Sequence, residues 1–260
     1  SSKPGFLHSS AEFGMKRLLA AGSGDIYQLS HVFRAAEQGS RHNPEFMMLE
    51  WYRCGFSITD LIQETAELVS QLAGPLFSHR KIESITHRQA FLRYAQVDVV
   101  TASIADLENA CGDIPAPLLG DDRDGWLDWL GSVKVFPELG KDTLCFLTDY
   151  PANQAALARL SPASHCDVAA LPGEAAVAAR FELFINGLEI GNGYHELSDP
   201  QEQKQRLEAA GGVVDDRFIA ALQHGLPDCA GIAVGIDRLM MLVCGKKSIS
   251  QVLPFDYDRA

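Results

Sequence analysis

Apolar residues recur at every third or fourth position across residues 57–75, SITDLIQETAELVSQLAGP, and this spacing predicts an amphipathic helix. Ser57 and Asp60 match a variant of the capping box that begins helices, and Gly74 followed by Pro75 is a stop signal. Shorter patterns of the same kind predict helices over residues 88–95, 103–110, 124–133, 201–210, 215–224 and 237–244.

Runs typical of β-strands lie between these helices. The runs at 25–34 and 43–53 flank a loop with Gly39 and Pro44, which predicts a long antiparallel hairpin. Further strands are predicted over 5–10, 142–150, 178–194 and 229–236. Because hairpins alternate with clustered helices and follow no regular βαβ order, the sequence favours an α+β fold with an antiparallel sheet. It contains no repeat or low-complexity linker, so residues 1–260 are predicted to form a single domain.

Composition and charge limit the classes of function that the chain could have. The chain carries a net charge of −12, which argues against nonspecific binding to DNA or RNA, but not against a small anion held by a few arginines. The six cysteines form no C-x-x-C pair, which argues against a zinc site and favours free thiols in a reducing cytoplasm. No apolar run approaches about 18 residues, so no membrane span is expected. The chain lacks an initiator Met and a signal peptide, and we expect that a segment before residue 1 is missing.

The first cluster of chemically active residues lies in the predicted hairpin, within residues 32–53. Strand alternation places Arg34 and Glu37 on opposite faces of the first arm. On the second arm it places Phe46 and Glu50 on one shared face. A guanidinium group opposite an aromatic ring suits a nucleotide, since arginine holds phosphate and the ring stacks on a base. The alternative is a solvated hairpin with surface ion pairs.

The second cluster spans residues 180–197. Glu182 and Glu189 flank an Asn-Gly turn signal at 186–187, and the predicted hairpin brings their carboxylates opposite each other, which suits Mg²⁺. Three residues that could receive an amine alternate onto one face beyond this turn: Asn192, Tyr194 and Glu196. The alternative is a pair of glutamates that only contribute surface charge.

The third cluster is a glycine-containing strand that runs directly into a helix. Gly231 and Gly235 allow a ligand to approach the backbone, and Arg238 in the first helical turn could hold a phosphate. A buried strand with a capping arginine is the alternative. Together, the three clusters fit an enzyme in which ATP activates a carboxylate, and neither a P-loop nor a Rossmann glycine motif is present.

These segments resemble the class II aminoacyl-tRNA synthetases of lysyl type. VFRAAEQGSRHNPEF (32–46) is similar to motif 2 of that family, and GIAVGIDRL (231–239) is similar to motif 3. SSAEFGMKRLL, MLEWYR and FELFINGLEIGNGYHEL resemble its lysine-site segments, in the family's order, whereas residues 76–142 carry no informative motif. Within this family, the sequence more closely resembles truncated paralogues that attach (R)-β-lysine to elongation factor P. Three features favour them: the little room for an anticodon-binding barrel, the Trp-Tyr-Arg at 51–53, and Ala233 in place of the usual Gly.

The resemblance implies an enzyme that uses ATP and Mg²⁺, with Arg34 and Arg238 as its catalytic residues. It implies that ATP is bound by Arg34, Ala36, His42, Asn43, Phe46, Glu182, Leu183, Gly235 and Arg238. It implies that the lysine substrate is bound by Ser10, Ala11, Glu12, Glu50, Tyr52, Glu189, Asn192, Tyr194, Glu196 and Ala233. Glu182 and Glu189 would hold the metal, Glu12 the amino group near the substrate carboxylate, and Glu196 the ε-ammonium group.

The sequence also departs from the family. Ala36 stands where motif 2 usually has Glu, and Glu37 is predicted to point away from Arg34, which would weaken ATP binding or reorient Arg34. Ala233 adds a methyl group that we expect to discriminate between lysine isomers by about 1–3 kcal/mol. Motif 1, which forms the family's dimer, is absent, in keeping with the expected loss of a preceding segment.

The resemblance implies partners as well as residues. These are elongation factor P as the acceptor protein, lysine or β-lysine as substrate, and a second copy in a homodimer, with no tRNA and no membrane. Two alternatives stay open, namely a lysyl-tRNA synthetase or its catalytic fragment, and an inactive module that binds lysine or adenylate.

Overall fold

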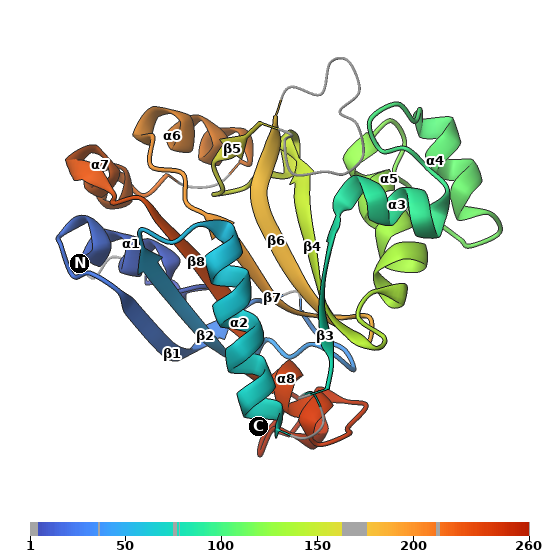
Figure 1. The fold of residues 1–260 in the computed structure, drawn as a ribbon, viewed down its shortest axis with the longest axis horizontal. Coiled ribbons are helices and arrows are strands. Elements are labelled where there is room, and N and C mark those ends of the chain that lie inside the picture. The colour runs from blue at the N-terminus through green and yellow to red at the C-terminus, as the bar shows by residue number, and fades with distance from the viewer. Residues whose placement is uncertain are drawn as a thin grey trace. The chain divides into compact units, whose positions relative to one another are not determined.

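The structure is a computed structural model that describes residues 5–35, 37–74, 77, 79–162, 176–211 and 214–259. The chain divides into two compact units, one formed by residues 1–78 with 190–260 and the other by residues 79–189. Each unit is described by itself, and the elements of both are labelled in Figure 1. The assignment of the whole chain to a single domain stays a prediction.

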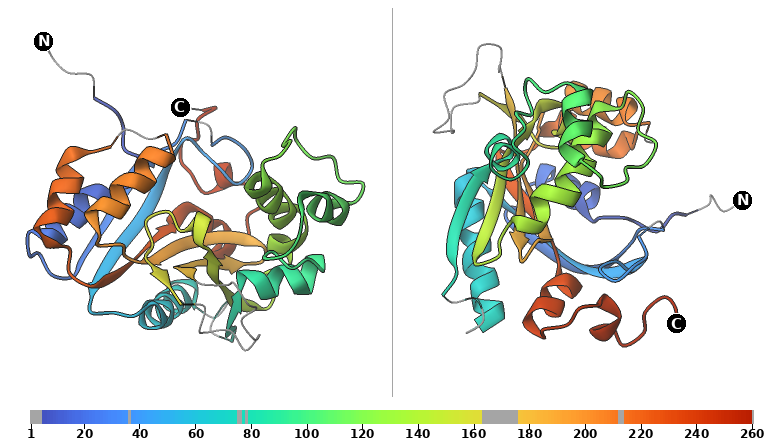
Figure 2. Two further views of the ribbon diagram at one scale, coloured as in Figure 1. Left: turned by 90° about the horizontal axis from the view of Figure 1, so that it is seen from above. Right: turned by 90° about the vertical axis from the view of Figure 1, so that its right-hand side faces the viewer.

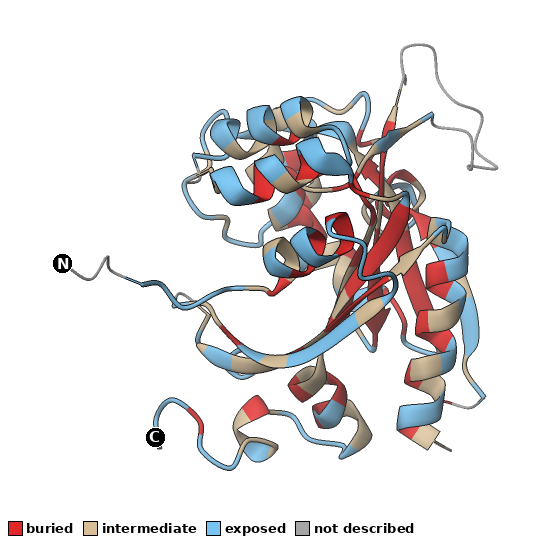
Figure 3. Ribbon diagram, turned by 90° about the vertical axis from the view of Figure 1, so that its left-hand side faces the viewer, coloured by how far each residue is buried: buried red, intermediate tan, exposed pale blue. Residues whose placement is uncertain are grey.

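The first unit is built on antiparallel strands in the order β1 (Ile26–Phe33), β2 (Glu45–Cys54), β8 (Cys229–Gly235) and β7 (Leu188–His195), the last of which continues from the second unit. β1 and β2 form the predicted hairpin, with Ile26 opposite Tyr52 and Phe33 opposite Glu45. Figure 3 shows β1 largely exposed, in contrast to the buried inner strands.

Helices cover both faces of these strands. On one face α1 (Glu12–Ala20) packs on α7 (Asp216–Gly225), which contacts α6 (Pro200–Ala209), and the three lie side by side in Figures 1 and 2. Their apolar core includes Met15, Leu19, Phe218 and Leu222. The opposite face is covered by α2 (Ile58–Ala73), and the chain continues from β8 into α8 (Ile236–Val243) and the 3-10 turn η5 (Ile249–Gln251).

In the second unit, β4 (Thr143–Pro151) pairs in parallel with β3 (Lys81–Thr86) and antiparallel with β6 (Val177–Ile185), which also pairs with the short β5 (Leu160–Ser161). The helices are α3 (His87–Ala95), α4 (Ile104–Cys111) and α5 (Arg123–Leu130), with shorter turns η2 (Gly131–Val135), η3 (Phe136–Glu138) and η4 (Ala152–Gln154). Phe91, Leu107 and Leu127 lie in its apolar core.

The sequence predicted most of these elements. The helix at 57–75 is confirmed as α2, and its capping box between Ser57 and Asp60 is formed. The strand predicted at 5–10 is wrong because these residues form no regular structure, and α1 and β3 were missed. None of the helices in the described part of the chain is long and apolar enough to cross a membrane.

Candidate functional site

Strand register in the first unit brings predicted substrate residues into two rows. Glu50 on β2 lies opposite Ala233 on β8, which lies opposite Asn192 on β7. The second row consists of Tyr52, Gly231 and Tyr194. Because the rows are two residues apart, they lie on the same face of the strands. Residues more than a hundred positions apart in the sequence are therefore gathered on one surface, as the resemblance implies.

Gly231 is required at the centre of the second row. A Cβ atom there would lie 2.3 Å from the Tyr52 ring and 2.9 Å from Glu196 Oε1, both too close for any side chain. Glu196 follows β7, and its N–H donates to the carbonyl oxygen of Cys229 (3.0 Å). The glycine thus allows the tyrosine ring and the carboxylate to lie directly against the backbone.

Glu50 anchors the start of α1. Its Oε2 accepts a hydrogen bond from the Ser10 hydroxyl and its Oε1 accepts one from the Ala11 N–H, both at 2.8 Å. Burial raises the pKa of Glu50, although these two hydrogen bonds oppose the increase. Glu50 therefore holds the segment that presents Glu12 to the face with the two rows.

Lys16 is a member of this site that the sequence analysis missed. Its side chain is fully buried, and its Nζ lies 2.5 Å from Glu12 Oε1 and 2.5 Å from Glu196 Oε2. The second contact is an ion pair that connects α1 to the residue after β7. The only signal in the sequence was the spacing of four residues between Glu12 and Lys16. We call Glu12, Lys16, Glu50, Tyr52 and Glu196 the acidic cluster.

Burial and charge act against each other in the acidic cluster. Burial alone would lower the pKa of Lys16, but the charges of Glu12 and Glu196 outweigh it and hold that pKa above its ordinary value. Burial raises the pKa of Glu196 to about 8, despite the lowering effect of Lys16. Burial also raises the pKa of Tyr52, and the nearby carboxylates add to this effect, so the phenol stays protonated.

The predicted phosphate-binding residues lie around the hairpin loop of the same unit. The Arg34 guanidinium lies 5.2 Å from the centre of the Phe46 ring, and its Nη1 is 3.1 Å from Glu37 Oε1. The prediction that Glu37 points away from Arg34 is wrong, because β1 ends at Phe33 and the backbone turns, with the Glu37 N–H donating to the Arg34 carbonyl (3.1 Å). Ala36 lies outside the described residues.

Several cations gather beside this loop. Arg238, in the first turn of α8, donates from Nε to the carbonyl oxygen of Arg41 (3.3 Å), and a Cβ on Gly235 would lie 3.8 Å from Arg238. Burial lowers the pKa of His42, and the positive charges of Arg238, Arg41 and Arg34 lower it further. Arg34 and Arg238 therefore belong to one electropositive region, which suits a polyphosphate.

Asn43 has a mainly structural position in this region. Its buried side chain donates to the Glu45 carbonyl (2.6 Å) and accepts from the Tyr257 N–H (3.0 Å). It therefore fixes the loop and the C-terminal segment that contacts it. His42 remains partly exposed, so its neutral imidazole is accessible to a ligand.

The predicted metal residues lie in the second unit. Glu182 on β6 and Glu189 on β7 line a cavity of about 410 Å³, together with Asp128 and Arg180. Arg180 Nη2 lies 2.5 Å from Glu182 Oε1. Burial raises the pKa of Asp128, the Gln154 amide opposes this, and the neighbouring Asp124 and Glu182 charges contribute to the increase. Leu183 is fully buried, so only its backbone could contact a nucleotide.

The residues of this cavity fit a magnesium ion. Mg²⁺ prefers oxygen ligands and is usually held by one or two carboxylates, with substrate phosphates and water completing its coordination. Glu182 and Glu189 supply that number. Among the described residues there is no group of three or more His, Cys, Asp or Glu placed to hold a metal ion.

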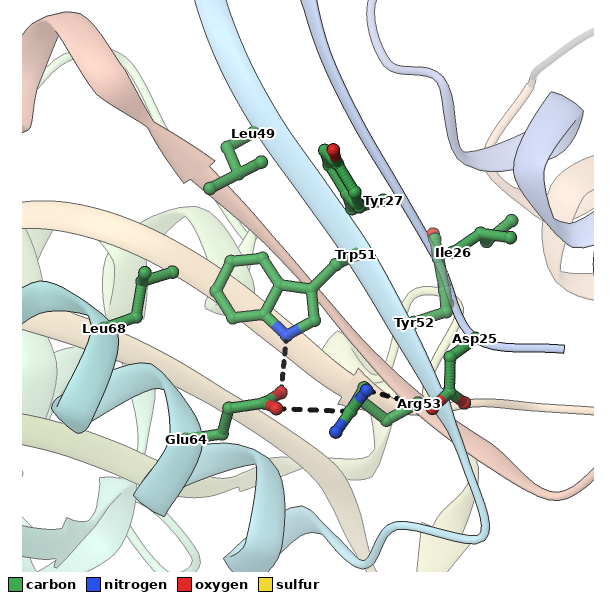
Figure 4. A pocket seen from close by; sticks show the side chains of 9 residues that line it. All are labelled: Asp25, Ile26, Tyr27, Leu49, Trp51, Tyr52, Arg53, Glu64 and Leu68. Atoms are coloured by element: carbon green, nitrogen blue, oxygen red, sulfur yellow. Dashed lines mark hydrogen bonds and ion pairs between the residues drawn. The ribbon is translucent and has the colours of Figure 1, made fainter.

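A second cavity, of about 420 Å³, lies on the opposite face of the first unit, between β2 and α2 (Figure 4). Figure 4 shows Trp51 Nε1 donating to Glu64 Oε2 (2.9 Å), while Arg53 pairs with both Glu64 and Asp25. The Trp-Tyr-Arg segment is therefore divided between two faces. Tyr52 belongs to the acidic cluster, whereas Trp51 and Arg53 attach α2.

The comparison with protein families identifies the fold. Residues 2–259 match the family described as tRNA synthetases class II (D, K and N). The chain belongs to this family of class II tRNA synthetases. The α+β fold class predicted from the sequence is confirmed, with one parallel strand pair, β3–β4, in addition to the antiparallel ones.

The comparison with individual curated proteins shows which members of the family the chain resembles. The chain is 41% identical to a protein of Klebsiella pneumoniae subsp. pneumoniae named elongation factor P–(R)-β-lysine ligase, over 98% of this chain and 78% of the relative. Proteins with the same name from Salmonella typhi and Edwardsiella ictaluri are 40% identical, with the same coverage. The predicted resemblance to these ligases is thereby confirmed.

Proposed function

We propose that this protein is an ATP-dependent ligase that activates (R)-β-lysine and transfers it to a lysine ε-amine of elongation factor P. The single observation that carries the proposal is the 41% identity, over nearly the whole chain, to a relative with that ligase name. The site supports it independently. The acidic cluster offers carboxylates to a substrate with amino groups, and Arg34 and Arg238 lie in one electropositive region.

The first step forms an adenylate. A carboxylate oxygen of the substrate attacks the α-phosphorus of ATP, and the bond from that phosphorus to the bridging oxygen breaks, releasing pyrophosphate. Negative charge accumulates on the phosphate oxygens during this attack. Arg34 would stabilise it at the α-phosphate and Arg238 at the γ-phosphate. Phe46, already packed against the Arg34 guanidinium, would stack on the adenine ring.

The second step forms the amide. The neutral ε-amine of the acceptor lysine attacks the activated carbonyl carbon, the bond to the phosphate oxygen breaks, and AMP leaves as the amine loses its proton. No protein nucleophile is required, so catalysis depends on positioning and charge stabilisation. Glu12, Glu196 and Tyr52 would hold the substrate during both steps.

A magnesium ion would be held by Glu182 and Glu189, where it would neutralise charge on the phosphates of ATP. Elongation factor P as acceptor is supported by the names of the relatives. A homodimer, the lack of tRNA binding and a cytoplasmic location stay predictions.

Ala233 is the residue that we assign to isomer selection. It lies between Glu50 and Asn192 in the first row, and its side chain is partly exposed on that face. A methyl group there narrows the floor on which the substrate backbone would rest. This favours an isomer whose amino group sits one carbon further from the carboxylate, with a preference of about 10- to 100-fold.

The test has two readouts. ATP–pyrophosphate exchange with α-lysine and with (R)-β-lysine measures activation, and intact-mass spectrometry of elongation factor P measures transfer. We expect faster exchange with (R)-β-lysine and a mass increase of one lysyl residue on the acceptor. A clear preference for α-lysine with transfer to tRNA would instead identify a lysyl-tRNA synthetase. Binding of ATP without exchange would identify an inactive module.

A further inference from the structure

The acidic cluster contains a cation that belongs to the protein. Burying an ammonium group is costly unless it is paired, and Lys16 is fully buried between Glu12 and Glu196. Lys204, which has the same spacing from Glu208, forms a longer pair of 3.8 Å with both side chains about half exposed. The close double pairing of Lys16 is therefore not a general property of such pairs in this chain.

The cluster has an excess of negative charge even with Lys16 present. It holds three carboxylates, from Glu12, Glu50 and Glu196, against one ammonium group. When all four groups are ionised, two negative charges remain. A substrate with two ammonium groups would balance them, whereas a substrate with one would leave a buried carboxylate without a counter-ion.

Lys16 also decides which carboxylate oxygens can meet a ligand. It contacts Oε1 of Glu12 and Oε2 of Glu196. The other oxygen of Glu196, Oε1, lies over Gly231, beside the row that also contains Tyr52 and Tyr194. Each of the two carboxylates thus keeps one oxygen that Lys16 does not contact, and that of Glu196 is directed to the face with the predicted substrate residues.

We propose that Lys16 is a positioning residue that makes the acidic cluster selective for a diamino acid. By bridging Glu12 and Glu196, it makes ionisation of both carboxylates less costly and orients their second oxygens toward the two substrate ammonium groups. This inference rests on the proposed function, because it assumes that the substrate is a lysine isomer. It adds a residue that does not itself need to touch the substrate.

The proposal has a consequence for pH dependence. Among the described residues, the titratable groups that face Glu196 are Lys16 and Glu12 from α1, Tyr52 from β2, and Cys229 from β8. Lys16 is the only cation among them. Burial raises the pKa of Glu196 to about 8, so that a proton already occupies the cluster at neutral pH in the free protein, and removal of Lys16 would raise this pKa further and hold the proton more tightly. The substrate would then have to displace that proton.

The experiment compares Lys16→Met with Lys16→Arg and with the matched surface control Lys204→Met, all in the full chain. Lysine-dependent ATP–pyrophosphate exchange is measured from about pH 6.5 to 9 with the isomer that the wild type prefers. For Lys16→Met, we expect KM for lysine to rise about 30-fold at neutral pH while kcat changes less than about threefold. We also expect the pH at which KM levels off to move up by about one unit.

Two further comparisons sharpen the test. Norleucine lacks the terminal ammonium group, so Lys16→Met should discriminate less between lysine and norleucine than the wild type does. Lys16→Arg retains the charge and should keep the wild-type pH profile, and Lys204→Met should match the wild type throughout. If Lys16→Met does not fold, a wild-type profile in Lys16→Arg supports the proposal, and a profile shifted upward overturns it.

The outcomes separate the two proposals. Exchange by the wild type together with an unshifted KM profile in Lys16→Met overturns the role of Lys16 and leaves the proposed function intact. A fall in kcat without any change in the pH profile or in norleucine discrimination also overturns it, because a merely structural lysine would act in that way. Exchange with neither lysine isomer in the wild type overturns both.

Discussion

The two units treat buried charge in different ways. In the first unit, every carboxylate of the acidic cluster contacts a donor or a cation of the chain itself, namely Lys16 or the donors of Ser10 and Ala11. In the second unit, the cavity that contains Glu182, Glu189 and Asp128 is lined by one guanidinium group, that of Arg180. The first arrangement is organised before any ligand binds, and the second favours an added cation.

Both units retain buried polar atoms that form no hydrogen bond with the described residues. In the second unit, His87 Nδ1 is one of them, and its side chain lines the cavity. Unsatisfied buried groups cost stability, so they are expected where function requires them or where a ligand completes them. We therefore expect the first unit to select the amino-acid substrate and the second unit to neutralise the charge of ATP through a bound cation. The following variants test this division of roles.

The largest effect is expected in the second unit. Glu182→Gln and Glu189→Gln remove metal-binding charge while preserving shape, and each should lower kcat/KM for exchange by about 100- to 1,000-fold. The required Mg²⁺ concentration should increase in both variants, whereas the affinity for lysine should hardly change in Glu182→Gln. Calorimetric titration of lysine checks the latter. A large loss of lysine affinity in Glu182→Gln would show that the proposed division between the units is wrong.

A smaller and complementary effect is expected from Glu196→Gln in the first unit. Loss of one carboxylate that faces an ammonium group should raise KM for lysine by about 30- to 100-fold, since a charged hydrogen bond is replaced by a neutral one. The Mg²⁺ dependence of exchange should stay as in the wild type. Steady-state kinetics at several Mg²⁺ concentrations measure both quantities, and a changed Mg²⁺ requirement would contradict the comparison.

The next effect concerns isomer preference. Ala233→Gly removes the methyl group between Glu50 and Asn192 and should shift the ratio of kcat/KM values toward α-lysine by about 10-fold. Exchange assays with both isomers, run in parallel on one preparation, measure this ratio. Ala230→Gly on the same strand is the matched control, because Ala230 faces Arg53 and His195 instead of the two rows. An unchanged ratio in Ala233→Gly would exclude this position as the selector.

The smallest effect is on stability. Burial, with help from the positive charge of Arg180, lowers the pKa of His87 to about 3. Below about pH 6.5, His87 binds a proton in the unfolded chain but stays neutral in the folded protein. This difference lowers the free energy of unfolding as the pH falls through that value. His87→Phe preserves the stacking with Phe91 and should unfold at a higher temperature than the wild type at pH 5 but not at pH 7.5. Thermal unfolding at the two pH values checks this, and an equal difference at both would contradict it.

Local patterns predicted the fold better than they predicted the site. α2 was predicted with its cap, because its apolar spacing and its Ser57–Asp60 box are both local signals. α1 was missed because it is short and its N-cap, Ala11, makes no side-chain cap hydrogen bond. β3 was missed because its six residues pair in parallel with a strand about sixty positions later. Such elements form through tertiary contacts that no local pattern records.

The same limit explains Lys16 and Glu37. A lysine four residues after a glutamate normally lies on a solvated helix face, and only the tertiary ion pair with Glu196 and the burial of its side chain show that Lys16 is enclosed. Strand alternation predicted Glu37 on the wrong side of Arg34 because the point where β1 ends could not be read from the sequence. By contrast, the rows that contain Glu50 and Tyr52 followed from alternation within a strand that was predicted correctly.

The division of Trp51, Tyr52 and Arg53 between opposite faces limits how β2 can change during evolution. Inserting or deleting one residue near its centre would reverse the facing of every side chain beyond that point, and would turn an indole or a guanidinium toward the carboxylates. The attachment of α2 would be lost in the same event. This strand can therefore diverge by exchange of side chains, whereas a change of length by a single residue would destroy two surfaces at once.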